Sequence, residues 1–102
     1  MAISDVQLKG SWYTVFDDNG KKIKDIQANY VGELCGFGSD FIVFVKGSFY
    51  STYNESGNKI KDMQVNYVGN FRNASGSTIV FKNGSFIGTY DKDFKKLSER
   101  QG

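Results

Sequence analysis

Residues 47–83 read GSFYSTYNESGNKIKDMQVNYVGNFRNASGSTIVFKN, and this stretch decides the fold because most of the chain is a variant of it. Residues 10–46 read GSWYTVFDDNGKKIKDIQANYVGELCGFGSDFIVFVK, and residues 84–102 begin a third copy with GSFIGTYDKDFKKLSERQG. Gly10, Gly47 and Gly84 follow one another at a spacing of 37 residues. A fixed period of this length is typical of repeat architectures. We therefore predict a single β-repeat domain over residues 1–102, with repeats at 10–46 and 47–83 and a partial repeat at 84–102.

The residues within each copy predict an all-β fold of antiparallel β-meanders. The chain has no proline, twelve glycines and 16% aromatic residues, a composition that favours short strands joined by tight turns. We expect an inner strand at 31–36, a second at 41–45, an aromatic third at 48–53 and a polar outer strand at 59–64. The second strand reads FIVFV, which is apolar on both faces and predicts burial on both sides. Helix should be nearly absent, with residues 91–100 the one place that tolerates a helical turn.

The cadence FDDNGKKI at 16–23 and YNESGNKI at 53–60 resembles bacterial WG-type β-repeats, although the Trp-Gly dipeptide itself is absent. The four-strand unit also resembles a blade of a β-propeller. This resemblance implies propeller-blade-like repeats and carries over no functional residues. Propeller rings typically contain four to eight blades, whereas this chain holds just under three. Two copies would complete a ring, so we predict a homodimer; a threefold β-prism or trefoil-like closed monomer, or a section of a longer repeat array, are the alternatives.

Composition argues against several function classes. The chain has no histidine and a single cysteine, Cys35, so the commonest general base, the commonest transition-metal ligand and any cysteine metal cluster are missing. We expect no enzyme activity, no catalytic residues, no metal site and no cofactor. Thirteen basic and eleven acidic residues give a net charge of +2, which is too small to predict nucleic-acid binding.

Two polar sets, each ending in an aromatic residue, are the candidate ligand-binding residues. Their polar members fall two apart, and therefore on one face of a regular strand. Amide and carboxylate groups beside a tyrosine can bind sugar hydroxyls or a peptide backbone. The alternative is that these side chains satisfy turn backbone groups. The sets are Asp25, Gln27, Asn29 and Tyr30, and Asp62, Gln64, Asn66 and Tyr67.

The aromatic residues also give structural expectations. Trp12, Phe49 and Phe86 recur at one strand position and are expected to pack between repeats, although they could form platforms for sugars or bases. Tyr13 and Tyr50, on the opposite face, are expected to be partly exposed. Phe94 stands where the other copies have Gly20 and Gly57, so the last turn should differ in shape, because phenylalanine does not cheaply adopt a positive φ. The residues predicted to be buried are Ile42, Phe44, Ile79, Val80 and Phe81.

Together these features predict a non-catalytic β-repeat module that binds a protein or glycan partner or assembles with copies of itself. Lectin-like glycan binding is the first alternative. Single-stranded nucleic-acid binding is the second, because lysines alternate with aromatics in every copy. The start of the chain, MAISDVQLKG, lacks the charged and apolar regions of a signal peptide, and the longest apolar run, at 41–45, is too short to span a membrane. We therefore expect a cytoplasmic protein without a membrane partner.

Overall fold

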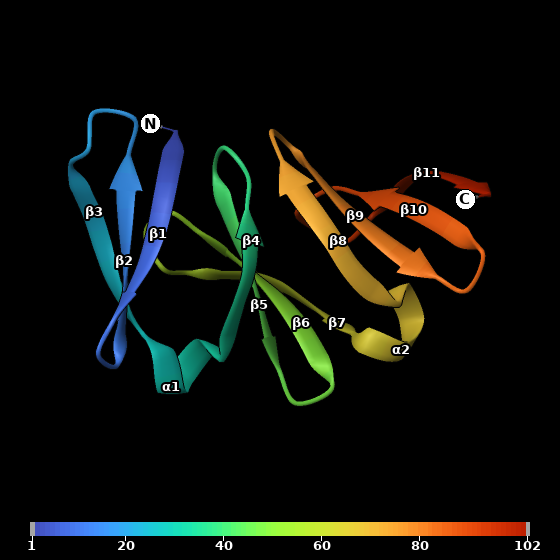
Figure 1. The fold of residues 1–102 in the computed structure, drawn as a ribbon, viewed down its shortest axis with the longest axis horizontal. Coiled ribbons are helices and arrows are strands. Elements are labelled where there is room, and N and C mark those ends of the chain that lie inside the picture. The colour runs from blue at the N-terminus through green and yellow to red at the C-terminus, as the bar shows by residue number, and fades with distance from the viewer. Residues whose placement is uncertain (1, 102) are drawn as a thin grey trace.

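The computed structural model describes residues 2–101, which form three antiparallel sheets side by side (Figure 1). The first sheet contains β1 (Ile3–Lys9), β2 (Trp12–Asp17) and β3 (Lys22–Gln27). The second contains β4 (Glu33–Phe37), β5 (Phe41–Lys46), β6 (Phe49–Asn54) and β7 (Lys59–Gln64), and the third contains β8 (Asn70–Ser75), β9 (Thr78–Asn83), β10 (Phe86–Tyr90) and β11 (Lys96–Gln101). One-turn helices α1 (Ala28–Val31) and α2 (Val65–Val68) join the sheets.

The all-β prediction is confirmed, whereas a closed arrangement is not formed. The three sheets do not close into a ring or a prism, so neither the propeller-type arrangement nor the threefold closed monomer is confirmed. Helix is nearly absent, as expected, but it lies at the connections after β3 and β7 and not at residues 91–100, where β11 forms. No helix in the described part of the chain is long and apolar enough to cross a membrane.

Two hydrophobic cores hold the sheets together, one at each junction between neighbouring sheets. The strand β5 serves both, because Ile42 and Phe44 point into the first core while Phe41 and Val43 point into the second. All four side chains are fully buried, which explains why FIVFV is apolar on both faces. The predicted burial of Ile42, Phe44, Ile79 and Phe81 is confirmed. Val80 is only half-buried, because it points to the side of the third sheet that has no neighbouring sheet.

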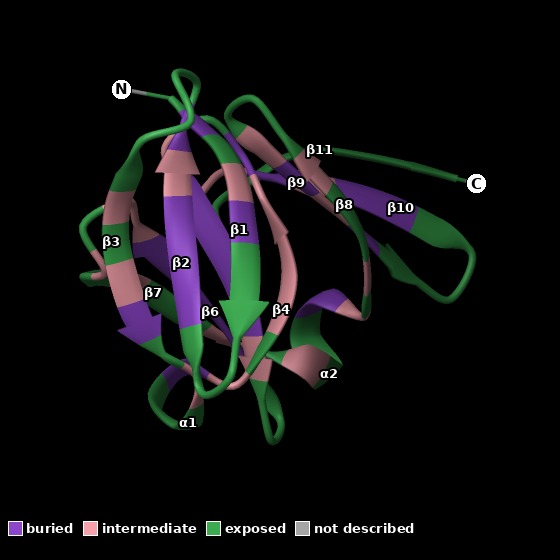
Figure 2. Ribbon diagram, turned by 60° about the vertical axis from the view of Figure 1, so that its left-hand side comes forward, coloured by how far each residue is buried: buried purple, intermediate pink, exposed green. Residues whose placement is uncertain are grey.

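The expected roles of the two aromatic faces are reversed. Tyr13 and Tyr50 are 5% exposed and pack in the first and second cores, whereas Trp12, Phe49 and Phe86 are exposed. Figure 2 shows that β2 is buried along most of its length. The exposed ring begins its strand in each case, at the end of the strand next to the hairpin turn. In β2 and β6 the tyrosine that follows the exposed ring points to the opposite face and packs in the core of the junction. Large aromatics at one repeated position are therefore not sufficient to identify the core.

The turn before β11 keeps the geometry of the preceding turns, contrary to the expectation. Phe94 adopts φ = 61°, and its N–H donates to the Asp91 carbonyl while the Asp91 N–H donates to the carbonyl of Lys95. The turn containing Gly57 has the same two hydrogen bonds. Phe94 is buried in the second core beside Phe81, with ring centroids 6.2 Å apart. This packing offsets the conformational cost of a positive φ.

Candidate ligand-binding site

A pocket of about 680 Å³ lies where α1 meets the outer half of the second sheet, and we call it the first junction pocket. Its walls combine aromatic rings with a few polar groups, which is the usual make-up of a ligand site. The lining residues are Tyr30, Val31, Lys46, Phe49, Ser51, Tyr53, Gly57, Asn58, Lys59 and Asp62. They come from α1, from β5, β6 and β7, and from the turn between β6 and β7.

The connection that carries Tyr30 is fixed by its backbone. Gly32 ends α1 at φ = 96°, and a Cβ atom there would lie 2.3 Å from the Val45 carbonyl oxygen, so no other residue fits. The Tyr13 hydroxyl donates to the Gly32 carbonyl (3.0 Å) and accepts the Leu34 N–H (3.1 Å). Tyr13 therefore fixes the backbone on both sides of the turn that follows α1. Tyr30 itself is 73% exposed, and its ring is free to contact a ligand.

The polar side of the pocket is organised around the Asp62 carboxylate. Ser51 Oγ donates to one carboxylate oxygen at 2.5 Å, and Lys59 Nζ donates to the other at 3.1 Å. The hydrogen bond from Ser51 and then that from Lys59 lower the pKa of Asp62, and the carboxylate raises the pKa of Lys59. Both groups are therefore charged at neutral pH. Their free lone pairs and N–H groups can accept from and donate to hydroxyl groups of a ligand.

A second pocket repeats this arrangement at the next junction, and we call it the second junction pocket. Each residue that lines it lies 37 positions after a residue that lines the first: Tyr67, Val68, Asn83, Phe86, Gly88, Tyr90, Lys96 and Glu99. Lys96 forms an ion pair with Glu99, as Lys59 does with Asp62. The pocket is smaller, at about 240 Å³, and Gly88 replaces the Ser51 hydroxyl. The two sites share an aromatic wall and a lysine–carboxylate pair. They differ in volume, in the loss of the Ser51 hydroxyl, and in having Asn83 in place of Lys46.

The structure divides the two predicted sets between sites. Tyr30 of the first set and Asp62 of the second line the first junction pocket, and Tyr67 lines the second. Asp25 lies on the opposite side of the first sheet from its core, bonded to Thr14 and Lys22. None of the remaining residues lines either pocket: Gln27, Asn29 and Asn66 are exposed, as is Gln64 at the end of β7. The sets separate because the strand ends at Gln27 or Gln64, and the helical turn then directs the tyrosine towards the next sheet.

Sequence reasoning missed several pocket residues, most clearly Ser51, Tyr53 and Lys59. The signal was present in the alternation Phe49-x-Ser51-x-Tyr53, which places these three side chains on one face. Recurring aromatics on such a face predict packing between repeats. Only the arrangement of the sheets shows that its outer half remains open beside Tyr30.

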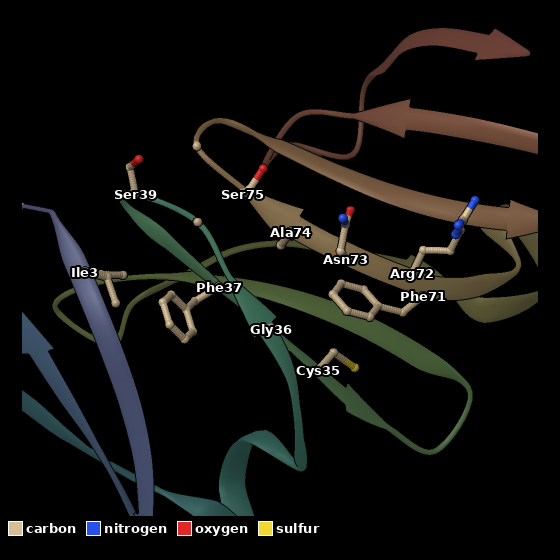
Figure 3. A pocket seen from close by; sticks show the side chains of 12 residues that line it. Ile3, Cys35, Gly36, Phe37, Ser39, Phe71, Arg72, Asn73, Ala74 and Ser75 are labelled. Carbon is tan, nitrogen blue, oxygen red and sulfur yellow. The ribbon is translucent and has the colours of Figure 1, made fainter.

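A third hollow lies between β4 and β8, with a volume of about 510 Å³ (Figure 3). Glycines and short side chains contribute much of its lining, and the Phe71 ring closes over Gly36, where a Cβ atom would lie 2.8 Å from it. Arg72 points away from Phe71 in this view. Burial raises the pKa of the Cys35 thiol to about 11, so this cysteine is not a nucleophilic thiolate at neutral pH. This hollow has fewer convergent polar groups than the junction pockets.

No group of three or more His, Cys, Asp or Glu side chains within residues 2–101 is arranged to hold a metal ion. The adjacent carboxylates Asp17 and Asp18 do not form a pair, since Asp17 is buried and accepts the N–H groups of Asn19 and Lys21. Asp18 is exposed. Asp17 therefore stabilises a turn.

In comparisons with known proteins, no family model, no curated protein and no solved structure matches this chain.

Proposed function

We propose that this chain is a non-catalytic binding module and that the ligand of its two junction pockets is a carbohydrate. One observation carries the proposal: the same constellation of tyrosine, phenylalanine, lysine and carboxylate is built at both junctions, 37 residues apart. A repeated set of exposed aromatic and polar side chains is more than packing requires, because the cores are formed by other residues. Of the two partner classes predicted from the sequence, glycan and protein, the glycan fits these pockets better.

The chemistry of a sugar ring matches these walls. One face of a pyranose presents C–H groups that pack against aromatic rings such as Tyr30 and Phe49, both of which line the first pocket. Its hydroxyls donate to a carboxylate and accept from an ammonium group, which Asp62 and Lys59 supply. Ionised donors and acceptors form the stronger hydrogen bonds. Nucleic acid, the third candidate, fits less well because Lys59 and Lys96 are already paired with carboxylates.

The non-catalytic part of the proposal rests on the state of the carboxylates. Glycoside hydrolysis uses two carboxyl groups that flank the scissile bond, one of them with a raised pKa. Asp62 is the one carboxylate among the described residues that line the first junction pocket, and its pKa is lowered. Such a group binds hydroxyls well and is a poor proton donor.

A cytoplasmic location remains a prediction.

We further propose that the three sheets are propeller-type blades, of which the first has three strands within the described residues. In the second and third sheets the inner strands are β4 and β8, which lie against each other. The junction pockets then lie where consecutive blades meet. Corresponding strands also pair in the same register: Thr52 faces Lys61 in the second sheet, and Val15 faces Lys24 in the first, 37 residues earlier. This shared register supports the interpretation that the sheets are copies of one unit.

A glycan array followed by isothermal titration calorimetry with the strongest-binding oligosaccharide tests the proposal. Tyr30→Ala should remove the first junction pocket from the binding isotherm, and Tyr67→Ala the second. Gln27→Ala is the matched control, because this exposed side chain lines neither pocket and should leave the isotherm unchanged. Absence of binding to any arrayed glycan, or isotherms that are unaffected by both tyrosine substitutions, would refute the proposed function.

A further inference from the structure

We propose that the outward side of the first sheet is a third carbohydrate site, which we call the first-sheet face. It consists of Trp12, Thr14, Phe16, Lys22 and Asp25. The inference rests on the proposed function, since it assigns the same class of ligand to a surface that has no neighbouring sheet. Cross-strand pairing places these side chains together, because Trp12, Thr14 and Phe16 alternate along β2 and Thr14 and Phe16 are partnered by Asp25 and Lys22.

Each residue of this face corresponds to a residue of the first junction pocket, 37 positions earlier. Trp12 corresponds to Phe49, Thr14 to Ser51, Phe16 to Tyr53, Lys22 to Lys59 and Asp25 to Asp62. The polar geometry is also the same. Thr14 Oγ1 donates to one oxygen of Asp25 at 2.9 Å, and Lys22 Nζ donates to the other at 3.1 Å. The hydrogen bond from Lys22, and then that from Thr14, lower the pKa of Asp25. The Asp25 carboxylate is therefore ionised at neutral pH, like that of Asp62.

The aromatic platform does not depend on a neighbouring sheet. Trp12 is 47% exposed on the open first-sheet face, against 44% for Phe49 and 48% for Phe86 inside the junction pockets. Tryptophan offers a larger ring surface than phenylalanine for stacking. Lys9 Nζ lies over the Phe16 ring, 5.5 Å from its centroid, within the range of a cation–π contact.

The face differs from the junction pockets in its floor and in one wall. Asp5 and Gln7 stand where the second sheet has Ile42 and Phe44, and Gln7 Nε2 donates to Asp5 at 2.9 Å. These two polar side chains keep the face open to water and add hydrogen-bonding groups. No described residue takes the place of Tyr30. Since one aromatic contact is lost, affinity should be about threefold to tenfold weaker than at the junction pockets.

Trp12 is the single tryptophan of the chain, so its fluorescence reports on this face alone. The experiment uses the full chain carrying Phe49→Ala and Phe86→Ala, which removes the platforms of both junction pockets. We expect the oligosaccharide that binds the wild type to shift and quench Trp12 emission in a saturable way. Adding Asp25→Asn should weaken this titration by at least fivefold, while Asp62→Asn, the matched control in the junction pocket, should leave it unchanged.

The outcomes separate this inference from the proposed function. If calorimetry shows binding at the junction pockets of the wild type but Trp12 emission stays constant in the double variant, the third site is refuted and the proposed function stands. An emission change that is insensitive to Asp25→Asn also overturns the third site. If no oligosaccharide binds the wild type by either measurement, both proposals fail. Circular dichroism of each variant checks that the strands remain folded.

Discussion

Replacement of Phe94 separates the packing and backbone contributions of one residue to stability. Its ring is 4% exposed in the second core, beside Phe81, while its backbone has φ = 61°. Phe94→Ala removes the packing and should lower the free energy of unfolding by about 3–5 kcal/mol. Phe94→Gly removes the same packing but also relieves the strain of the positive φ, which is about 1–2 kcal/mol. Glycine gives back about 0.5–1 kcal/mol of this gain, because it is more flexible in the unfolded chain.

The glycine variant should therefore be more stable than the alanine variant by about 1 kcal/mol, or about 4–8 °C in melting temperature for a domain of this size. Urea denaturation followed by circular dichroism measures both differences. The matched control is Gly57→Ala at the corresponding turn, where φ is 84° and a Cβ atom would make only ordinary contacts, the nearest at 3.4 Å from Ile26. Gly57→Ala should lower the free energy of unfolding by about 1 kcal/mol, because alanine is strained at a positive φ. Equal stability of the two Phe94 variants would refute the argument from backbone strain, and a loss below about 1 kcal/mol for Phe94→Ala would refute the packing argument.

Three further predictions concern the cores and the pockets. Phe81→Ala should lower the free energy of unfolding by about 3–5 kcal/mol in urea, since the ring is fully buried, and a loss under about 1 kcal/mol would show that β9 is not central. Tyr13→Phe should cost about 1–3 kcal/mol by leaving Gly32 and Leu34 backbone groups without a partner, and calorimetry should show weaker binding at the first junction pocket only. Oligosaccharide affinity should be constant from pH 5 to pH 7, because the pKa of Asp62 lies below its ordinary value of 3.8 and the chain has no histidine; a tenfold change over that range would contradict the assigned role of Asp62.

The sequence predicted the strand order of each copy well, because apolar periodicity and glycine placement report directly on local structure. FIVFV identified β5 as a strand buried on both faces, and the structure places it between the two cores. The exposure of the aromatic faces could not be predicted in the same way. Trp12 and Tyr13 are both large aromatics on opposite faces of β2, and Tyr13 is the buried one because its face packs against the second sheet while the Trp12 face has no neighbouring sheet. Which face is covered is a property of the assembled sheets.

The candidate site was predicted in part, and the part that failed was the assumption of a regular strand. Asp62 and Tyr67 were grouped because they lie five residues apart with alternating polar residues between them. The helical turn α2 breaks the alternation, and each tyrosine joins the carboxylate of the next sheet instead. A connection of four helical residues has weak sequence signals, since α1 and α2 have no side-chain cap and no charged residue in their terminal turns.

The terminal faces bear on the predicted homodimer. Ile3 and Val6 at one end are buried in the first core, whereas Leu8 at that end and Leu97 at the other are exposed. The outward side of the first sheet presents Asp5 and Gln7. The residues at the corresponding positions of the second sheet, Ile42 and Phe44, are fully buried. Covering this face with the third sheet of another copy would remove the Asp5 carboxylate from water, and none of the ion pairs among the described residues includes Asp5, so its burial is costly. We therefore expect sedimentation equilibrium at high micromolar concentration to give a stable mass of 11.4 kDa, and a dimer of twice that mass would show that a second copy overcomes this cost.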